Sequence, residues 1–308
     1  MKPNNKTAQP NIQISSCVIF GKGELSANIL RKISPNKSIS IKAVLPNSLP
    51  DDEFESAAKS LSIPIVSKTE AQQISCSFIL ILHHDWLIKP ESYQTKKIFN
   101  IHSGHLPERR GHGSNILSFL NSQPISLSLH TVNTAMDDGE VLTTIDCPYT
   151  TTDSYQTIQK SMQHQLLNNI DYIINLCINY IPNPQYQTLR LSEIKYSSKF
   201  NWRDGIIDFN LPGPALTRLA QVFLGGTGLF ITHKQNHIQI QHFKFVPIST
   251  QEDKIRIIGT VVDKYSNETT RTTFHIISCK GGYIEVQLER ELAIGTRLQG
   301  AKLEYIHS

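Results

Sequence analysis

In the first half of the chain, short apolar runs typical of strands alternate with segments of helical spacing, and this alternation limits the possible folds more than any other feature. Strand-like runs are expected at 14–20, 38–45, 63–66, 78–82, 98–102, 125–132 and 141–146. Helical spacing is found at 25–33 and 51–61, and a longer helix is expected from Asp153 to about Tyr180. Strands that alternate with helices along the chain usually pair in parallel, so we expect an α/β domain with a Rossmann-like, mostly parallel sheet.

The character of the sequence changes after Pro182 and Pro184. A helix is expected over 214–223, and strand-like runs follow at 229–232, 237–246, 255–264, 271–278 and 283–289. Short strands in series favour a small β-barrel of the OB-like kind. We therefore expect a disordered leader at 1–13, a first domain at 14–182, a linker at 183–202 and a barrel domain at 203–308.

Charge and cysteine usage narrow the class of protein. The net charge is +4, and lysines and arginines are scattered without any run longer than a pair. A dedicated nucleic-acid surface would usually show a denser basic stripe. The 5 cysteines are far apart and form no Cys-x-x-Cys pair, which suits a reducing, cytoplasmic location. No apolar stretch approaches the ~18 to 20 residues of a membrane span.

Asn100 and His102 are the first candidates for chemistry. They lie two residues apart in a strand-like run, so both side chains project from the same face. Gly104, Pro107 and Gly111 then indicate a loop at the end of the strand. Ligands of open α/β sheets bind beyond the strand ends, so this loop is the expected pocket.

Asp137 supplies a carboxylate that completes the candidate set. It follows the strand-like run 125–132, and Gly139 allows a tight turn beside it. A carboxylate near a histidine can fix its tautomer and raise its basicity. An asparagine amide aimed at a developing oxyanion typically contributes ~3 to 4 kcal/mol. Together these groups indicate acyl transfer to a nitrogen.

The motif resembles that of the formyltetrahydrofolate-dependent formyltransferases, whose pattern is Asn-x-His, Leu-Pro, Arg-Gly and Asp-x-Gly in that order. The matching positions are Asn100 and His102, Leu106-Pro107, Arg110-Gly111, and Asp137-Asp138-Gly139. His130 stands seven residues before Asp137, as in several amino-sugar members. Segment 203–209 is similar to the hinge that opens the second domain of methionyl-tRNA formyltransferases. The resemblance thus covers nearly all of the chain.

This resemblance implies a 10-formyltetrahydrofolate donor, a primary amine acceptor and no metal. It implies catalytic roles for Asn100, His102 and Asp137, of which the first two stabilise the oxyanion and the third orients His102 and helps to remove the amine proton. The residues expected at the donor are Asp85, Trp86 and Leu87 through their backbone, with His130, Asp138 and Gly139. Those expected at the acceptor are Gly21, Lys22, Gly23, Arg110 and Gly111.

The Gly21-Lys22-Gly23 turn has the composition to hold a phosphate on helix N–H groups. It fails as a dinucleotide fingerprint because Ser26 stands where the third glycine belongs. A departure from the family pattern follows the catalytic histidine: the serine expected two residues after it is replaced by Gly104, and Ser103 comes directly after His102.

The acceptor is expected to be a small amine, such as that of a nucleotide-linked amino sugar. Residues 45–53 are short and acidic where initiator-tRNA formylases carry a basic insertion, and Gln221 lies where relatives tend to have an arginine. Methionyl-tRNA formylation is the alternative, and a catalytically silent folate-binding relative is a third reading. Whether the barrel binds substrate or mediates formation of a homodimer stays open.

A metal hydrolase is a fourth reading, from another class of protein. His102, His105, His112 and Asp137 include a His-x-x-His pair that could close a zinc site. The pair falls on a loop broken by Pro and Gly, whereas the metalloprotease motif requires His-Glu-x-x-His on a helix.

Overall fold

The structure is a computed structural model, and it describes residues 14–47, 53–84, 86–95, 97–150, 152–183, 186, 195–248, 257–303, 305 and 306. The expected leader, half of the expected linker, positions 48–52 of the acidic segment and Asp85 lie outside these residues. The chain forms two compact units. The first comprises residues 1–110, 126–145 and 162–195, and the second comprises 111–125, 146–161 and 196–308. Residues 111–125 and 146–161 thus group with the C-terminal part, although they fall within the expected first domain.

A six-stranded sheet with the order β2-β1-β3-β4-β6-β7 organises the first unit. Its elements are β1 (Ser15–Gly21), α1 (Gly23–Ile33), β2 (Ile39–Pro46), α2 (Glu53–Ser60), α3 (Lys68–Gln73), β3 (Phe78–Ile81), η1 (Pro90–Ser92), β4 (Ile98–His102), β6 (Ser126–Thr131) and β7 (Val141–Asp146). Strand β1 pairs in parallel with β2 and β3, and β3 pairs in parallel with β4. Strand β4 is antiparallel to β6. The expected α/β fold with a mostly parallel sheet is confirmed.

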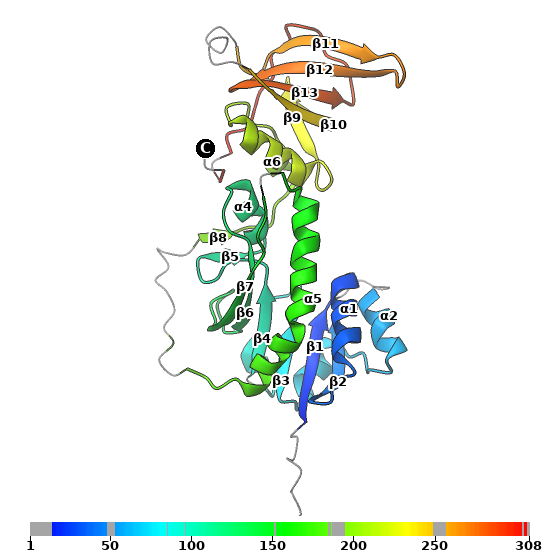
Figure 1. The fold of residues 1–308 in the computed structure, drawn as a ribbon, viewed down its shortest axis with the longest axis vertical. Coiled ribbons are helices and arrows are strands. Elements are labelled where there is room, and N and C mark those ends of the chain that lie inside the picture. The colour runs from blue at the N-terminus through cyan, green and yellow to red at the C-terminus, as the bar shows by residue number, and fades with distance from the viewer. Residues whose placement is uncertain are drawn as a thin grey trace, which may run out of the picture. The chain divides into compact units, whose positions relative to one another are not determined.

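The apolar runs of the sequence become the buried centre of this sheet. Val18 and Phe20 of β1 are fully buried with Ile79 of β3 and Ile98 of β4 in one cluster. Helices α1 and α2 pack side by side, as Figure 1 shows. The strand expected at 63–66 is wrong, because only Ile65 forms a bridge, to Val44. The run is too short to extend the sheet beyond β2.

The second unit is built on a five-stranded antiparallel sheet with the order β11-β12-β13-β10-β9. Its strands are β9 (Leu229–His233), β10 (Asn236–Pro247), β11 (Val261–Asn267), β12 (Thr272–Cys279) and β13 (Gly282–Leu288). Helix α6 (Gly213–Phe223) packs against β10, and η3 (Trp202–Gly205) and α4 (Ser114–Leu120) pack against α6. Helix α5 (Tyr155–Asn179), β5 (Arg109–Gly111) and β8 (Lys195–Ser197) run across the boundary between the units.

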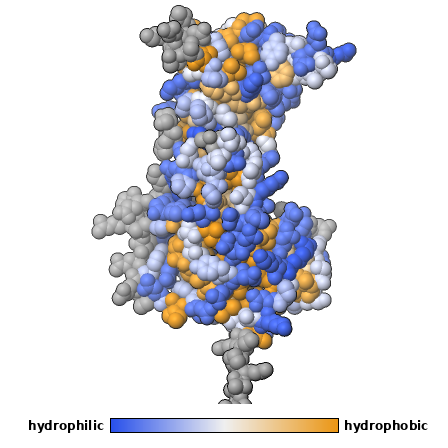
Figure 2. All heavy atoms as spheres, in the orientation of Figure 1, coloured by the Kyte–Doolittle hydropathy of each residue, from blue (hydrophilic) through white to orange (hydrophobic). Residues whose placement is uncertain are grey.

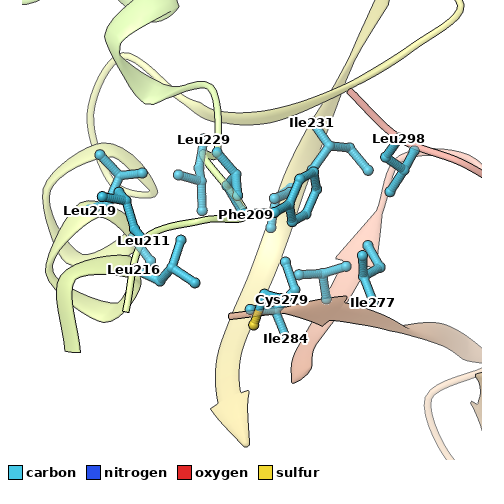
Figure 3. Close-up of a cluster of buried hydrophobic side chains, with 14 of the residues drawn as sticks. Phe209, Leu211, Leu216, Leu219, Leu229, Ile231, Ile277, Cys279, Ile284 and Leu298 are labelled. Carbon is cyan, nitrogen blue, oxygen red and sulfur yellow. The ribbon is translucent and has the colours of Figure 1, made fainter. Parts of the chain in front are cut away.

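Phe209 occupies the centre of the second hydrophobic core. Its side chain is 2% exposed, and Figure 3 shows its ring among Leu229 and Ile231 of β9 and Ile284 of β13. Gly259 and Gly300 face the same ring, and an added Cβ on Gly300 would lie 3.1 Å from it. This core holds the sheet against α6.

Apolar residues on the face drawn in Figure 2 are interspersed with hydrophilic ones. Among the helices of the described ranges, none combines the length and apolar character that a membrane crossing requires.

Candidate functional site

The pairing of β4 with β6 creates the site by placing Asn100 directly opposite His130. The Asn100 Nδ2 atom lies 3.0 Å from His130 Nε2. An amide nitrogen carries two hydrogens, so one can donate to His130 while the second donates elsewhere. Phe99 and Ile101, on the other face of β4, are buried and fix which side of the sheet Asn100 and His102 occupy.

His130 is held as a neutral ring of known tautomer. Its Nδ1 lies 2.8 Å from the carbonyl oxygen of Thr131, and a carbonyl can only accept, so Nδ1 carries the hydrogen. Nε2 then accepts from Asn100. Burial lowers the pKa of His130 to about 4, against an opposing effect of Asp137. The ring therefore orients the Asn100 amide throughout the neutral pH range.

His102 is fixed in the same manner. Its Nε2 lies 2.9 Å from the carbonyl oxygen of Arg109, so Nε2 carries a hydrogen and donates it. Its Nδ1 lies 3.4 Å from Oδ2 of Asp137. Any proton that His102 gains or loses therefore comes and goes at Nδ1, beside the carboxylate.

Asp137 lies between two imidazoles, with Oδ2 toward His102 and Oδ1 3.6 Å from Nε2 of His130. Its φ of 51° lies in the left-handed region, which Asp adopts more readily than most residues. At Gly139, an added Cβ would lie 1.6 Å from the carbonyl oxygen of Thr131, so only glycine fits. Glu140 completes the turn by donating its N–H to Oγ1 of Thr131 over 2.9 Å.

The loop after β4 is fastened by Ser128, which the sequence reasoning missed. The Ser128 hydroxyl donates to the carbonyl oxygen of Gly104 over 2.7 Å and accepts from the N–H of Leu106 over 3.2 Å. Ser128 stands two residues before His130 on β6, so the alternation of side chains along the strand could have placed it on the same face as His130. Tyr186 was also missed; its hydroxyl donates to the carbonyl oxygen of Gly139 over 2.9 Å. No local pattern in the sequence marks that contact.

Arg110 and Asp138, expected at the acceptor and the donor respectively, form a buried ion pair with each other. Arg110 is 1% exposed and Asp138 is 8% exposed. Gly111, also expected at the acceptor, has a φ of 92°, and an added Cβ would lie 2.1 Å from the carbonyl oxygen of Ser197. The ion pair thus connects the loop after β4 to the turn after β6, and the glycine lets β5 approach β8 closely.

The turn between β1 and α1 has the expected form, with Lys22 extended before the helix and Gly23 at a φ of 69°. The N–H of Lys22 donates to Oγ of Ser26 over 3.2 Å. Ser26, at the missing third glycine, thus engages one N–H that a phosphate would otherwise use. An added Cβ on Gly21 would lie 2.8 Å from this serine.

The segment after β3 was expected to contact the donor through its backbone. Trp86 is partly buried, makes an edge contact with His84 at 4.7 Å and lies under Nζ of Lys68 at 5.3 Å. Leu87 is 56% exposed. Asp85 lies outside the described residues.

The histidines of the metal-site reading have separate contacts. His105 lies 3.1 Å from Oγ of Ser126 and 4.0 Å from Glu108, and His112 is exposed. Within the described residues, no three His, Cys, Asp or Glu side chains gather closely enough to hold a metal ion.

The arrangement supplies an N–H donor from Asn100, a protonatable Nδ1 on His102 and a carboxylate from Asp137. Hydrogen-bond donors fixed before the reaction can stabilise a developing oxyanion. A carboxylate beside a histidine can take up or release a proton at the same place. The geometry therefore fits attack of a nucleophile on a carbonyl carbon.

Comparison with known proteins points to one group. No family model matches the chain. It is 22% identical over 260 residues to the methionyl-tRNA formyltransferase of Buchnera aphidicola subsp. Acyrthosiphon pisum (strain Tuc7), covering 83% of this chain and 77% of the relative. The resemblance inferred from the motif is confirmed.

Two solved structures of sugar N-formyltransferases have the same fold over most of the chain. WlaRD, a sugar 3N-formyltransferase studied with dTDP and 5-N-formyl-THF, has a TM-score of 0.63 and 21% identity, covering 91% of this chain and 99% of WlaRD. The N-formyltransferase of Helicobacter canadensis, in complex with folinic acid and dTDP-3-aminofucose, has a TM-score of 0.61 and 19% identity, covering 89% and 99%.

Proposed function

Because the chain has the fold and the motif of the formyltransferase family, we propose that it moves a formyl group from 10-formyltetrahydrofolate to a primary amine. The observation that carries this proposal is the convergence of Asn100, His102 and Asp137. Two nitrogen donors and one carboxylate, of which His102 is buried and the other two are partly buried, fit a formyl group under attack.

In the proposed reaction, the amine attacks the formyl carbon and the new C–N bond pushes an electron pair onto the formyl oxygen. The Asn100 amide and the Nδ1–H of protonated His102 donate to that oxygen. Asp137 receives the amine proton on its carboxylate, which lies 3.4 Å from Nδ1 of His102. The bond to the donor nitrogen then breaks, the proton passes to that nitrogen, and the products are a formamide and tetrahydrofolate.

The donor is proposed to lie against the backbone of Trp86 and Leu87, with Asp85 completing the segment, and beside His130 and Gly139. The exposure of Leu87 supports this placement, since 56% of the residue is accessible at the surface of the first unit. The Asp138 side chain is engaged by Arg110, so neither is assigned a direct contact here.

The acceptor is proposed to be a nucleotide-linked amino sugar, held partly on the Gly21-Lys22-Gly23 turn. The first turn of the 11-residue helix provides N–H groups and Lys22 provides a charge for a phosphate, while the Lys22 N–H itself is engaged by Ser26. The structural relatives that bind a dTDP-sugar or dTDP support this class. Methionyl-tRNA is the second candidate, favoured by the Buchnera relative.

The second unit is proposed to be a closed, OB-like barrel. Segment 295–299 supports this proposal, because Leu298 donates its N–H to Gly259 beside β11 while Gln299 donates to Thr232 of β9. These are the two edges of the five-stranded sheet. A homodimer and a cytoplasmic location are also proposed; all 5 cysteines are free thiols, which suits a reducing compartment.

The test is formyl transfer by the purified protein from 10-formyltetrahydrofolate to dTDP-3-aminofucose, related nucleotide amino sugars and methionyl-tRNA, with product mass as the readout. A formylated nucleotide sugar, gained by the wild type and lost by Asn100→Ala, is the expected result. Formylation of methionyl-tRNA alone would select the second candidate. Donor binding without transfer to any acceptor would favour the catalytically silent reading.

A further inference from the structure

The buried ion pair of Arg110 and Asp138 lies between the two loops that carry the candidate catalytic groups. Asp138 directly follows Asp137 in the turn after β6, and Arg110 directly follows Arg109, whose carbonyl oxygen accepts from His102. Asp138 is thus one peptide bond away from Asp137, and Arg110 is one peptide bond away from the residue whose carbonyl oxygen binds His102.

Arg110 also fixes its own loop. Its Nε donates to the carbonyl oxygen of Pro107 over 3.3 Å, and its Nη1 donates to Oδ1 of Asp138. On the other side, Oδ2 of Asp138 accepts from Nδ2 of Asn133 over 3.3 Å. One guanidinium therefore joins the loop at 103–109 to the turn at 133–139, in addition to the Ser128 contacts that fasten the same loop to β6.

The location of this pair is difficult to explain by stability alone. Removing two charges from water is costly, and well-packed apolar side chains of similar volume are often as stabilising or more so. Asp137, moreover, adopts a left-handed backbone conformation that must be held by its neighbours. A buried ion pair at this position fixes the backbone next to Arg109 and the backbone next to Asp137.

We propose that Arg110 and Asp138 are positioning residues, which set the distance between Nδ1 of His102 and the Asp137 carboxylate without contacting either substrate. This inference rests on the proposed function, and it replaces the direct binding roles expected from the sequence. Misplacement of a reacting group by about 1 Å can lower turnover by about 10²-fold, so a loss of this size is expected when the pair is removed.

The test compares Asp138→Asn, Arg110→Met and the double variant Arg110→Met/Asp138→Leu. Each single variant leaves one buried group without its charged partner and is expected to melt at a lower temperature. The double variant should regain the wild-type melting temperature, since both charges are gone. Its kcat should remain roughly 10- to 100-fold low, with KM for donor and acceptor within about twofold of wild type.

A second readout does not depend on formyl transfer. The imidazole resonances of His102, assigned with His102→Gln, are titrated by NMR in the wild type and the double variant, where the pH midpoint should move because the Asp137 carboxylate has shifted. The matched control is Lys264→Met/Glu291→Leu, which removes an exposed ion pair in the second unit. This control should leave kcat, KM and the titration unchanged.

Recovery of kcat together with the melting temperature in the double variant, and an unchanged His102 titration, would overturn the positioning role. A large rise in KM for the acceptor or the donor with kcat preserved would instead restore a direct contact. If the wild type transfers no formyl group, the proposed function fails, while the His102 titration still decides whether the pair positions the contact.

Discussion

Replacement of Asp137 by Asn tests the electrostatic core of the site. The change keeps the size and shape of the side chain, and asparagine tolerates the left-handed φ of 51° that alanine would adopt with more strain. It removes the negative charge 3.4 Å from Nδ1 of His102. The exposed fraction of the Asp137 side chain is 13%, so water screens the interaction little.

The size of the effect follows from that separation. Two unit charges 3.4 Å apart attract by about 5 kcal/mol at an effective dielectric constant of about 20. The amide dipole retains part of this attraction, so we expect a loss of roughly 3 to 4 kcal/mol in transition-state stabilisation. Since about 1.4 kcal/mol is a factor of ten, kcat should fall by roughly 10²- to 10³-fold.

The assay follows release of tetrahydrofolate under saturating donor and acceptor, with the melting temperature measured in parallel. Asp171→Asn, the same chemical change on an exposed position of α5, should leave kcat unaltered. An Asp137→Asn enzyme that turns over within about tenfold of wild type, with an unchanged melting temperature, would show that the carboxylate charge does not serve the reaction.

The pKa of His130 is lowered in the folded state, so between about pH 6.5 and 4 the unfolded chain takes up a proton that the folded chain does not. The free energy of unfolding should therefore fall as the pH is lowered through this window. Chemical unfolding of His130→Gln should show a shallower decline. Gly139→Ala brings a Cβ against the carbonyl oxygen of Thr131 and should abolish transfer while donor binding, measured by calorimetry, weakens as well; near-normal kcat would contradict the fitted turn. Phe209→Ala leaves a cavity in the core of the second unit and should cost about 3 to 5 kcal/mol in its free energy of unfolding, measured by urea titration; a cost below about 1 kcal/mol would show that the core is not centred on this ring.

The sequence predicted those elements whose apolar period is long enough to be distinctive. Strands β1, β4 and β6 and the long helix α5 lie within one or two residues of the expected ranges. Helix α3 was not expected, although its Ser67 and Glu70 form a reciprocal cap, because its 6 residues are mostly polar. Strands of three residues such as β5 depend on a partner distant in sequence, which no local pattern reveals.

The candidate site divides in the same way. The two-residue spacing was enough to predict that Asn100 and His102 lie on one face. Asp137 comes close to them because β6, which precedes it, pairs with β4. The pairing of Arg110 with Asp138 depends on how two loops meet. Adjacent charges in a motif look like binding groups in a sequence, and only the fold shows that they neutralise each other.

The register of β4 against β6 has a consequence for which changes of length the chain can tolerate. Asn100 meets His130 across this pair, and side chains alternate between the two faces of a strand. One residue inserted between Ser126 and His130 would turn the ring to the opposite face, whereas one inserted in the turn at 121–124 would leave the pairing intact. Homologous chains can thus vary in length before β6 begins, but no insertion or deletion is expected within the five residues 126–130.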